Sequence, residues 1–177
     1  MKKNIPNRIH IIGSVGSGKT TLAKTLSKNY QITYYEMDNV VWERHKSGDI
    51  RRTAEERDKY LEKIVSTDRW IIEGVHHYEW VDKSFKKADL IIFLDTPYKL
   101  RIFRIIKRYI RQILRVEVAH YTPSFKIFKD LLIWNKVFEK EIKPKVLNML
   151  QQDNVNSITL KDSIDIDRIL NKGRFLY

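Results

Sequence analysis

Eight residues near the start of the chain have the types and spacing of a loop that binds phosphate. The segment Gly13-Ser14-Val15-Gly16-Ser17-Gly18-Lys19-Thr20 fits the pattern Gly-x-x-x-x-Gly-Lys-[Ser/Thr] at every position. Glycines let the backbone wrap closely round a polyphosphate and direct its N–H groups at the oxygens. The residues expected to bind the nucleotide are Gly13, Ser14, Gly16, Ser17, Gly18, Lys19, Thr20 and Thr21.

The last two residues of this loop predict the cofactors. Lys19 should reach the terminal phosphates, and the Thr20 hydroxyl should take one Mg²⁺ position, so ATP and Mg²⁺ are expected. The alternative, a glycine-rich turn that binds nothing, is disfavoured because Lys and Thr are both present. A GTPase is also disfavoured, because the nearest string to its Asn-Lys-x-Asp motif, residues 135–138, lacks the Asp.

Acidic residues follow three of the predicted strands. Glu36 and Asp38 stand two apart, so in extended chain both carboxylates would point the same way. We predict that Glu36 and Glu73 join Thr20 around Mg²⁺, and that Asp38 holds or deprotonates an acceptor hydroxyl. The alternative for these acids is a helix cap or a solvated loop position. That alternative is preferred for Asp95, which precedes Thr-Pro at a predicted helix start.

A basic segment, residues 99–129, contains nine Lys or Arg and one acid, which gives +8 of the net charge of +12. At about 100° per residue, five of its arginines fall within roughly an 80° arc of a helix. An opposite, isoleucine-rich side is expected to dock on the core. The five arginines are Arg101, Arg104, Arg108, Arg111 and Arg115.

Three interpretations of the arginines remain open. In a kinase lid, Arg104 and Arg108 would hold nucleotide phosphates, and Arg111 or Arg115 would reach the transferring phosphoryl group. The same residues could instead grip a nucleic-acid backbone or form a solvated face. We favour the lid, because no nucleic-acid-binding motif is present. The predicted catalytic residues are Lys19, Asp38, Arg104, Arg108 and Arg115.

The acceptor side is the least specified part of the predicted site. Besides Asp38, we expect Trp42, Arg52 and Gly74 to border a small acceptor. An arginine there suits an anionic acceptor, and an ordinary surface position explains it equally well. His76-His77 is interpreted as a polar loop, because a metal site needs more ligands than one adjacent pair.

The elements that must position these residues alternate along the chain. Thr53 and Glu56 form a capping box, two Thr-Pro pairs at 96–97 and 122–123 signal helix starts, and Pro144 should interrupt a helix. Alternating strands and helices predict an α/β fold with a parallel sheet covered on both faces. The expected strands are 8–12, 32–35, 70–72, 90–94 and 155–160, and the expected helices include 19–27, about 97–115 and 164–170.

Composition limits the class of protein. The 177 residues predict one domain, 1–177, with 99–129 as a basic lid or helical segment. Without cysteine there can be no disulfide or thiolate metal site. No apolar run approaches the ~18–20 residues of a membrane span, and the apolar stretch 9–12 is too short for a signal peptide. We therefore expect a soluble, cytoplasmic protein without a membrane partner; its oligomeric state is not predicted.

Several ordered motifs together resemble one family. They are the loop 13–20, the acid-containing segment 35–42, the segments 69–74 and 88–97, and the Arg-x-x-x-Arg of Arg104 and Arg108. In this order they resemble the adenylate-kinase-like proteins named for DNA-topology modulation (FlaR-like), which are similar to shikimate and nucleoside-monophosphate kinases. The resemblance implies a P-loop three-layer sandwich with five parallel strands, ATP with Mg²⁺, and a mobile helical lid. The family's name leaves a nucleotide-dependent DNA-binding protein as the alternative function.

The sequence also departs from that family. Residues 73–76 read Glu-Gly-Val-His where family members more often have Asp-Gly-Asn-Tyr, and Glu36 stands where shikimate kinases have Asp. The Asp-Gly-x-Pro-Arg of nucleoside-monophosphate kinases is absent, which makes a nucleotide acceptor less expected. The sequence thus predicts a small-molecule kinase without naming its acceptor.

Overall fold

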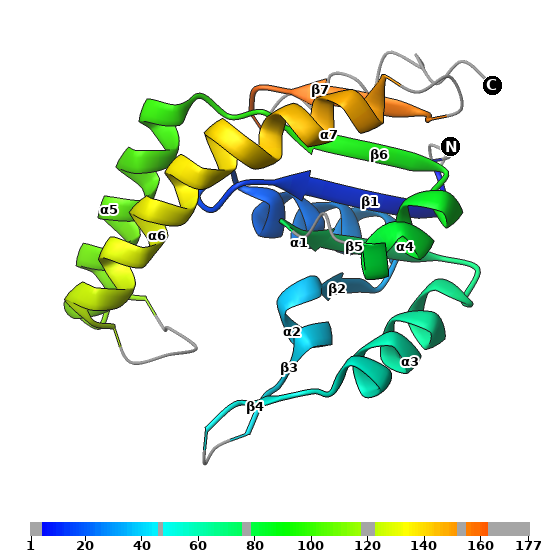
Figure 1. The fold of residues 1–177 in the computed structure, drawn as a ribbon, viewed down its shortest axis with the longest axis horizontal. Helices are drawn as coiled ribbons and strands as arrows, with labels where there is room; N and C mark the ends of the chain where they lie inside the picture. The colour runs from blue at the N-terminus through cyan, green and yellow to red at the C-terminus, as the bar shows by residue number, and fades with distance from the viewer. Residues whose placement is uncertain (1–4, 46–47, 76–78, 118–122, 152–154, 163–177) are drawn as a thin grey trace.

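A five-stranded parallel sheet organises the chain in the computed structural model, which describes residues 5–45, 48–75, 79–117, 123–151 and 155–162 (Figure 1). The strands lie in the order β2-β5-β1-β6-β7, and every neighbouring pair is parallel. This confirms the predicted α/β fold. The strands are β1 (Arg8–Gly13), β2 (Tyr34–Glu36), β5 (Trp70–Gly74), β6 (Leu90–Leu94) and β7 (Ser157–Leu160).

Helices cover both faces of the sheet. Helix α1 (Lys19–Tyr30) packs through Leu22 and Leu26 on the face that carries Ile9 and Ile11. The other face, which carries Ile12, packs against α3 (Ala54–Val65), α4 (Asp82–Lys87) and α7 (Lys143–Leu150). Because central strands are buried on both faces, β1, β5 and β6 are almost continuously apolar.

The connection between β2 and α3 contains three short elements that the sequence analysis did not anticipate. They are α2 (Met37–Val41) and an antiparallel hairpin of β3 (Trp42–Glu43) and β4 (Ile50–Arg51). Helix α3 then starts at the predicted capping box. The Glu56 N–H donates to Thr53 Oγ1 at 3.2 Å, and the Thr53 N–H donates to the Glu56 carboxylate at 2.8 Å.

After β6 the chain forms an arm of two helices, α5 (Tyr98–Ile113) and α6 (Phe125–Val137), which pack together and project to one side of the sheet (Figure 1). The rings of Tyr109 and Phe128 stack across them with centroids 4.6 Å apart. The second predicted helix start is shifted, because Ser124 rather than a Thr-Pro pair caps α6 by accepting from the Ile127 N–H.

Pro144 interrupts the following helix as predicted. A π-helical turn, η2 (Phe138–Ile142), separates α6 from α7, and the proline lies in the first turn of α7. Proline has no N–H to donate and its ring displaces the preceding carbonyl, which breaks the regular hydrogen-bond ladder. The predicted closing helix 164–170 lies outside the described residues. None of the described helices is long and apolar enough to cross a membrane.

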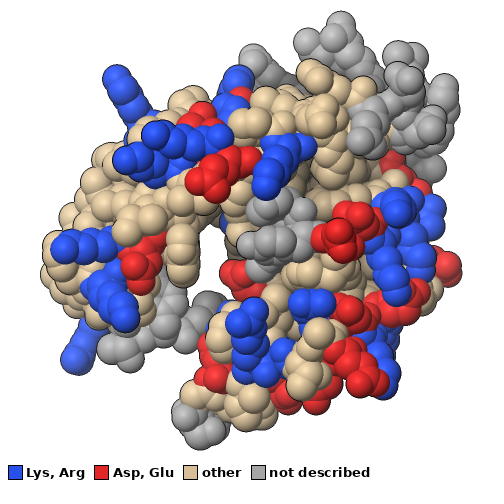
Figure 2. All heavy atoms as spheres, viewed as in Figure 1, with Lys and Arg blue, Asp and Glu red and all other residues tan. Residues whose placement is uncertain are grey.

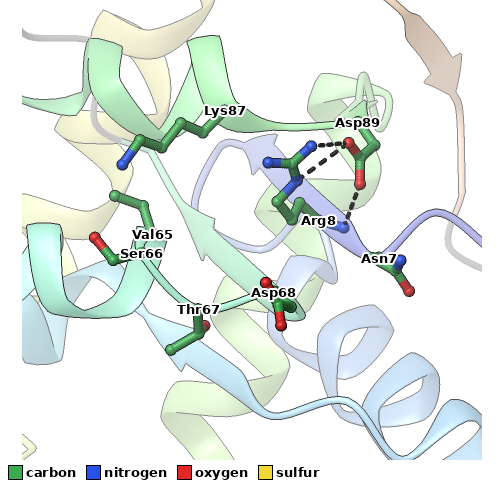
Figure 3. Close-up of a pocket in the computed structure, with 8 residues that line it drawn as sticks. All are labelled: Asn7, Arg8, Val65, Ser66, Thr67, Asp68, Lys87 and Asp89. Atoms are coloured by element: carbon green, nitrogen blue, oxygen red, sulfur yellow. Dashed lines mark hydrogen bonds and ion pairs between the residues drawn. The ribbon is translucent and has the colours of Figure 1, made fainter.

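An open pocket lies at the amino ends of the strands, on the edge of the sheet away from the glycine-rich loop (Figure 3). Arg8 donates from its backbone and guanidinium to Asp89 at 2.6–3.1 Å. Burial raises the pKa of Asp89, but the bonds from Arg8 outweigh it and hold the pKa below its usual value. The arginine is thus committed to a structural ion pair, and the pocket shows no arrangement of groups suited to chemistry.

Candidate active site

The glycine-rich loop, residues 13–20, connects the carboxyl end of β1 to the start of α1. Gly16 and Gly18 have φ angles of 75° and 94°, in the left-handed region that side chains disfavour. A Cβ on Gly16 would lie 2.9 Å from the Arg101 carbonyl oxygen. Helix α1 starts without a side-chain cap or an acidic residue in its first turn, so its positive end remains available to an anion. The loop therefore has the conformation of a phosphate cradle.

Three side chains meet at the end of this loop. The Lys19 amine lies 3.4 Å from the Ser14 carbonyl oxygen and 3.9 Å from the Glu73 carboxylate. The Thr20 hydroxyl donates to the same carboxylate at 2.5 Å. Glu73 is buried at the end of β5, and this burial raises its pKa, although Lys19 and Thr20 oppose the rise. The predicted cation, hydroxyl and acid are thus brought together.

Glu36 and Asp38 also lie near Glu73, but not in the predicted geometry. Glu36 ends β2, pairs in register with Glu73 and precedes the first residue of α2, whereas Asp38 lies in the first turn of that helix. The expectation that both carboxylates project from extended chain is wrong, because the helix begins at Met37. Both charges nevertheless add to the rise in the pKa of Glu73. The described residues contain no group of three His, Cys, Asp or Glu arranged to hold a metal.

The predicted acceptor residues surround α2. Arg52 donates to the Asn39 carbonyl at 2.7 Å, and its guanidinium lies 4.7 Å from the Tyr60 ring centroid, so it ties α2 to α3. Trp42 is exposed in β3, and Gly74 is the buried last residue of β5. His76 and His77 lie outside the described residues. Figure 2 shows the molecule hollowed between this region and the α5–α6 arm.

Two of the predicted lid arginines lie along α5 on its inward side. Arg104 donates to the Ser17 carbonyl at 3.1 Å and to Asp162 at 2.8 Å. Arg108, one turn further along, is half-buried. Arg115 is not on the arginine arc, because α5 ends at Ile113 and Arg115 has a φ of 56°. The backbone N–H of Arg115 donates to the Gln112 carbonyl, which closes the helix end.

The expected orientation of α5 is only partly correct. Arg101 is buried, donates to Glu139 and packs against the rings of Tyr98 and Phe138. The isoleucine side is divided: Ile105 is 1% exposed and docks on the core as expected, whereas Ile106, Ile110 and Ile113 face outward, with Ile110 50% exposed. The ion pair with Glu139 and the bonds of Arg104 supply the partners that allow arginines to face the protein.

Residues distant in sequence hold the loop from outside, and sequence reasoning missed them. Ser14, itself buried, donates to Asn135 of α6 at 2.9 Å, and Thr96 donates to the Ser17 carbonyl at 3.0 Å. The Thr-Pro pair at 96–97 predicts Thr96 as the cap of α5, but the Thr96 hydroxyl donates to the glycine-rich loop instead. No local pattern marks such contacts; it is the fold that makes Asn135 the one fully buried residue of α6.

Asp95 is a structural acid. It lies between Lys143 and Lys161, at 2.6 Å from each amine. Burial raises the pKa of Asp95, but the bonds from Lys143 and Lys161 outweigh it, so the pKa lies below its usual value. Both carboxylate oxygens therefore have lysine partners. The predicted helix cap or solvated position is wrong, because Asp95 is buried in these ion pairs and α5 has no side-chain cap.

Known proteins resemble this chain over almost its whole length. The uncharacterized protein YqaC of Bacillus subtilis is 29% identical over 97% of both chains. The shikimate kinase of Acinetobacter baumannii, solved with shikimate, superimposes with a TM-score of 0.54 at 17% identity, over 98% of this chain and 97% of that one. No protein-family model matches.

The relative that decides the family is a cytidylate kinase from Sulfurisphaera tokodaii. It is 33% identical over 87% of this chain and 98% of its own length. The membership agrees with the sheet order and the phosphate cradle described above. The chain therefore belongs to the family of P-loop kinases that contains this cytidylate kinase.

Proposed function

We propose that this protein transfers the γ-phosphoryl group of MgATP to a small anionic acceptor. The observation that carries the proposal is the meeting of Lys19, Thr20 and Glu73 at the end of the glycine-rich loop. These groups supply one cation and hard oxygen ligands, which is the donor set that a nucleoside triphosphate and Mg²⁺ need. Ser17 Oγ, buried and without a hydrogen-bond partner among the described residues, is a further donor within the loop.

In this proposal the protein acts by position and charge rather than by covalent chemistry. Lys19 and the loop N–H groups hold the phosphates, and Thr20 and Glu73 would hold Mg²⁺. When bound, the metal neutralises charge on the phosphate oxygens. The acceptor oxygen bonds to the γ-phosphorus as the bond to the β-phosphate oxygen breaks, which leaves ADP. Asp38 orients the acceptor and, for a hydroxyl acceptor, takes its proton.

The acceptor class rests on two further considerations. A nucleoside monophosphate is suggested by the cytidylate kinase relative, and shikimate by the structural neighbour. Both are anions, and Arg51 and Arg52 border the acceptor side. We favour the monophosphate because the cytidylate kinase shares far more of its sequence with this chain. The absence of the Asp-Gly-x-Pro-Arg clamp requires that other cations hold the phosphate.

The alternative, a nucleotide-dependent DNA-binding protein, loses support from the orientation of α5. Arg101 is buried and Arg104 is half-buried, and both pair with acids of this chain, so they are not part of an outward basic stripe. The lid interpretation requires arginines that face the protein. A grip on a nucleic-acid backbone requires arginines that face outward.

A coupled assay for ADP formation would test the proposal with CMP, shikimate and a wider metabolite panel. We expect at least one small anion to raise ATP turnover well above the hydrolysis seen without acceptor. Lys19→Ala should abolish that rise while the far-ultraviolet circular dichroism spectrum is retained. Lys28→Ala, an exposed lysine on the same helix, is the matched control. Stimulation by duplex DNA alone, without any small acceptor, would reverse the conclusion.

A further inference from the structure

Helix α5 turns part of its apolar side away from the protein, although Ile105 is buried. Five large apolar residues form this surface, which we call the outer α5 face, and all are exposed, from 39% for Ile106 to 66% for Leu114. At about 100° per residue they fall within roughly a 100° arc. Single exposed apolar residues are ordinary, but a continuous row along a helix marks an interaction site. The residues are Phe103, Ile106, Ile110, Ile113 and Leu114.

The charges around this face have one sign. Among the described residues from 98 to 137, seven charged side chains are exposed and all are cations. The two acids there, Glu117 and Asp130, are half-buried, and Glu117 pairs with Arg111. On the helix itself, Lys107 and Arg111 border the apolar row. The exposed cations are Lys99, Lys107, Arg111, Arg115, Lys126, Lys129 and Lys136.

This combination selects among the possible partners. A second copy of the chain would bring like charges together, because α5 contains no acid and the nearby Glu117 already pairs with Arg111. A nucleic acid would match the charge but would not cover a row of isoleucines. An acidic phospholipid bilayer offers anionic headgroups and hydrocarbon side by side, which is the environment of an interfacial amphipathic helix.

We propose that the outer α5 face docks on the surface of a membrane that contains acidic phospholipid. Helix α5 lies in the interface with Phe103, Ile106 and Ile110 in the acyl boundary and Lys107 at the headgroups. The proposal replaces the expectation of no membrane partner, which considered only spanning segments. The helix lies on the bilayer and does not span it, and no described helix is long and apolar enough to span one. Arg104 and Arg108 remain on the opposite, inward side, so the phosphate cradle stays in water.

The test is co-sedimentation of the full chain with vesicles. We expect binding to mixed phosphatidylcholine–phosphatidylglycerol vesicles, little binding to phosphatidylcholine alone, and release by added salt. Ile110→Gln should weaken binding roughly tenfold or more, since a buried isoleucine side chain is worth about 1.5–3 kcal/mol. Lys107→Gln should weaken it about fivefold. Ile50→Gln and Lys28→Gln, exposed residues elsewhere on the surface, should bind like the wild type.

Two results with vesicles would overturn the proposal. One is failure of the wild type to bind acidic vesicles, and the other is vesicle binding that Ile110→Gln leaves unchanged. Light scattering that shows a lipid-free dimer, broken by Ile110→Gln, would assign the face to a second copy. Duplex DNA binding that depends on Lys107 but not on Ile110 would assign it to nucleic acid. Turnover without vesicles should be unchanged in Ile110→Gln, which separates this result from any failure of the proposed kinase activity.

Discussion

At the scale of single residues, the phosphate cradle is held by a hydrogen bond from Ser14 to Asn135, 121 residues further along the chain. Ser14 and Asn135 are both fully buried, and the Ser14 hydroxyl donates to the Asn135 side chain. The Ser14 carbonyl in turn accepts from the Lys19 amine. Asn135 of α6 therefore holds the loop residue whose carbonyl Lys19 contacts.

Asn135→Ala should lower the free energy of unfolding by about 1–3 kcal/mol, because it leaves a buried hydroxyl unpaired. It should also raise the KM for ATP more than it lowers kcat, since the loop binds phosphate in the ground state. Ser14→Ala should have similar effects. The double variant should lose less free energy of unfolding than the sum of the losses in the two single variants. Asn148→Ala, an exposed asparagine on α7, is the control. Additive costs in urea unfolding would show that the two residues are not coupled.

Asp38 provides the test of the acceptor side. Asp38→Asn should leave ATP affinity within a few-fold. If the acceptor is a hydroxyl rather than the favoured monophosphate, the change should also lower phosphoryl transfer by roughly 10²–10⁴, because Asp38 then takes the proton. The comparison is Asp68→Asn, an exposed acid at the other edge of the sheet. Isothermal titration with ATP and the ADP-formation assay measure the two effects separately. A collapse of ATP binding would assign Asp38 to the metal site or to the fold.

Sequence reasoning found the loop residues because their pattern is local. A strand, a glycine turn and a helix N-terminus together form the cradle from eight consecutive positions. Asn135 was missed because it meets Ser14 only after the intervening sheet and arm have folded. Asp38 was predicted on an incorrect geometric argument, since one turn of helix starts at Met37 where extended chain was assumed.

At the scale of elements, the orientation of α5 separates its arginines. Arg104→Ala should lower turnover far more than Arg115→Ala, because Arg104 contacts the loop at Ser17 whereas Arg115 lies beyond the helix end. An arginine that acts on the transferring group is worth about 10³–10⁵ in rate. Steady-state kinetics of the two variants and of Arg108→Ala decide the order. Equal losses in all three would indicate a diffuse electrostatic effect instead.

The direction of α5 could not be read from its periodicity. The hydrophobic pattern of a helix gives the angle between its apolar and charged sides. Which side faces the protein depends on whether acidic partners elsewhere in the chain can pair with its arginines. Burial of Arg101 requires Glu139, thirty-eight residues later, and Arg104 requires Asp162. The strands were predictable because their burial on both faces leaves no such choice.

Asp95 joins three elements at the end of the sheet. It directly follows β6 and forms ion pairs with Lys143 of α7 and with Lys161, which follows β7. Because these bonds lower the pKa of Asp95, its stabilising effect should be complete above its ordinary pKa of about 4. The effect should be lost as the pH falls through the lowered folded-state value.

Asp95→Asn should therefore reduce Tm at pH 7, and the difference from the wild type should shrink as the pH falls below about 4. Differential scanning calorimetry across this range measures the change. Asp58→Asn, an exposed acid on α3, should show little difference at either pH. A Tm difference for Asp95→Asn that stays constant with pH would exclude the ion pairs as its cause.

At the scale of the whole molecule, the α5–α6 arm faces a hollow beside the cradle (Figure 2). Arg104 already bridges the arm to the loop, and Asn135 anchors the other helix of the arm. If ATP binds at the loop, a change in loop conformation would therefore reach both helices of the arm through these two contacts. This coupling, rather than any single residue, is what the lid interpretation requires.

Hydrogen exchange can detect that coupling. Amides in 98–117 and 123–137 should become more protected with ATP and acceptor together than with either alone, because a lid closes over both. Amides of β3 and β4 should respond mainly to the acceptor. Lys19→Ala should remove the response to ATP while it leaves the unliganded exchange pattern unchanged.

If instead duplex DNA protects the arm and ATP does not, the arm is a binding surface rather than a lid. We expect the ligand-dependent pattern, because Arg104 of α5 contacts the cradle at Ser17, whereas Ile106, Ile110 and Ile113 face outward.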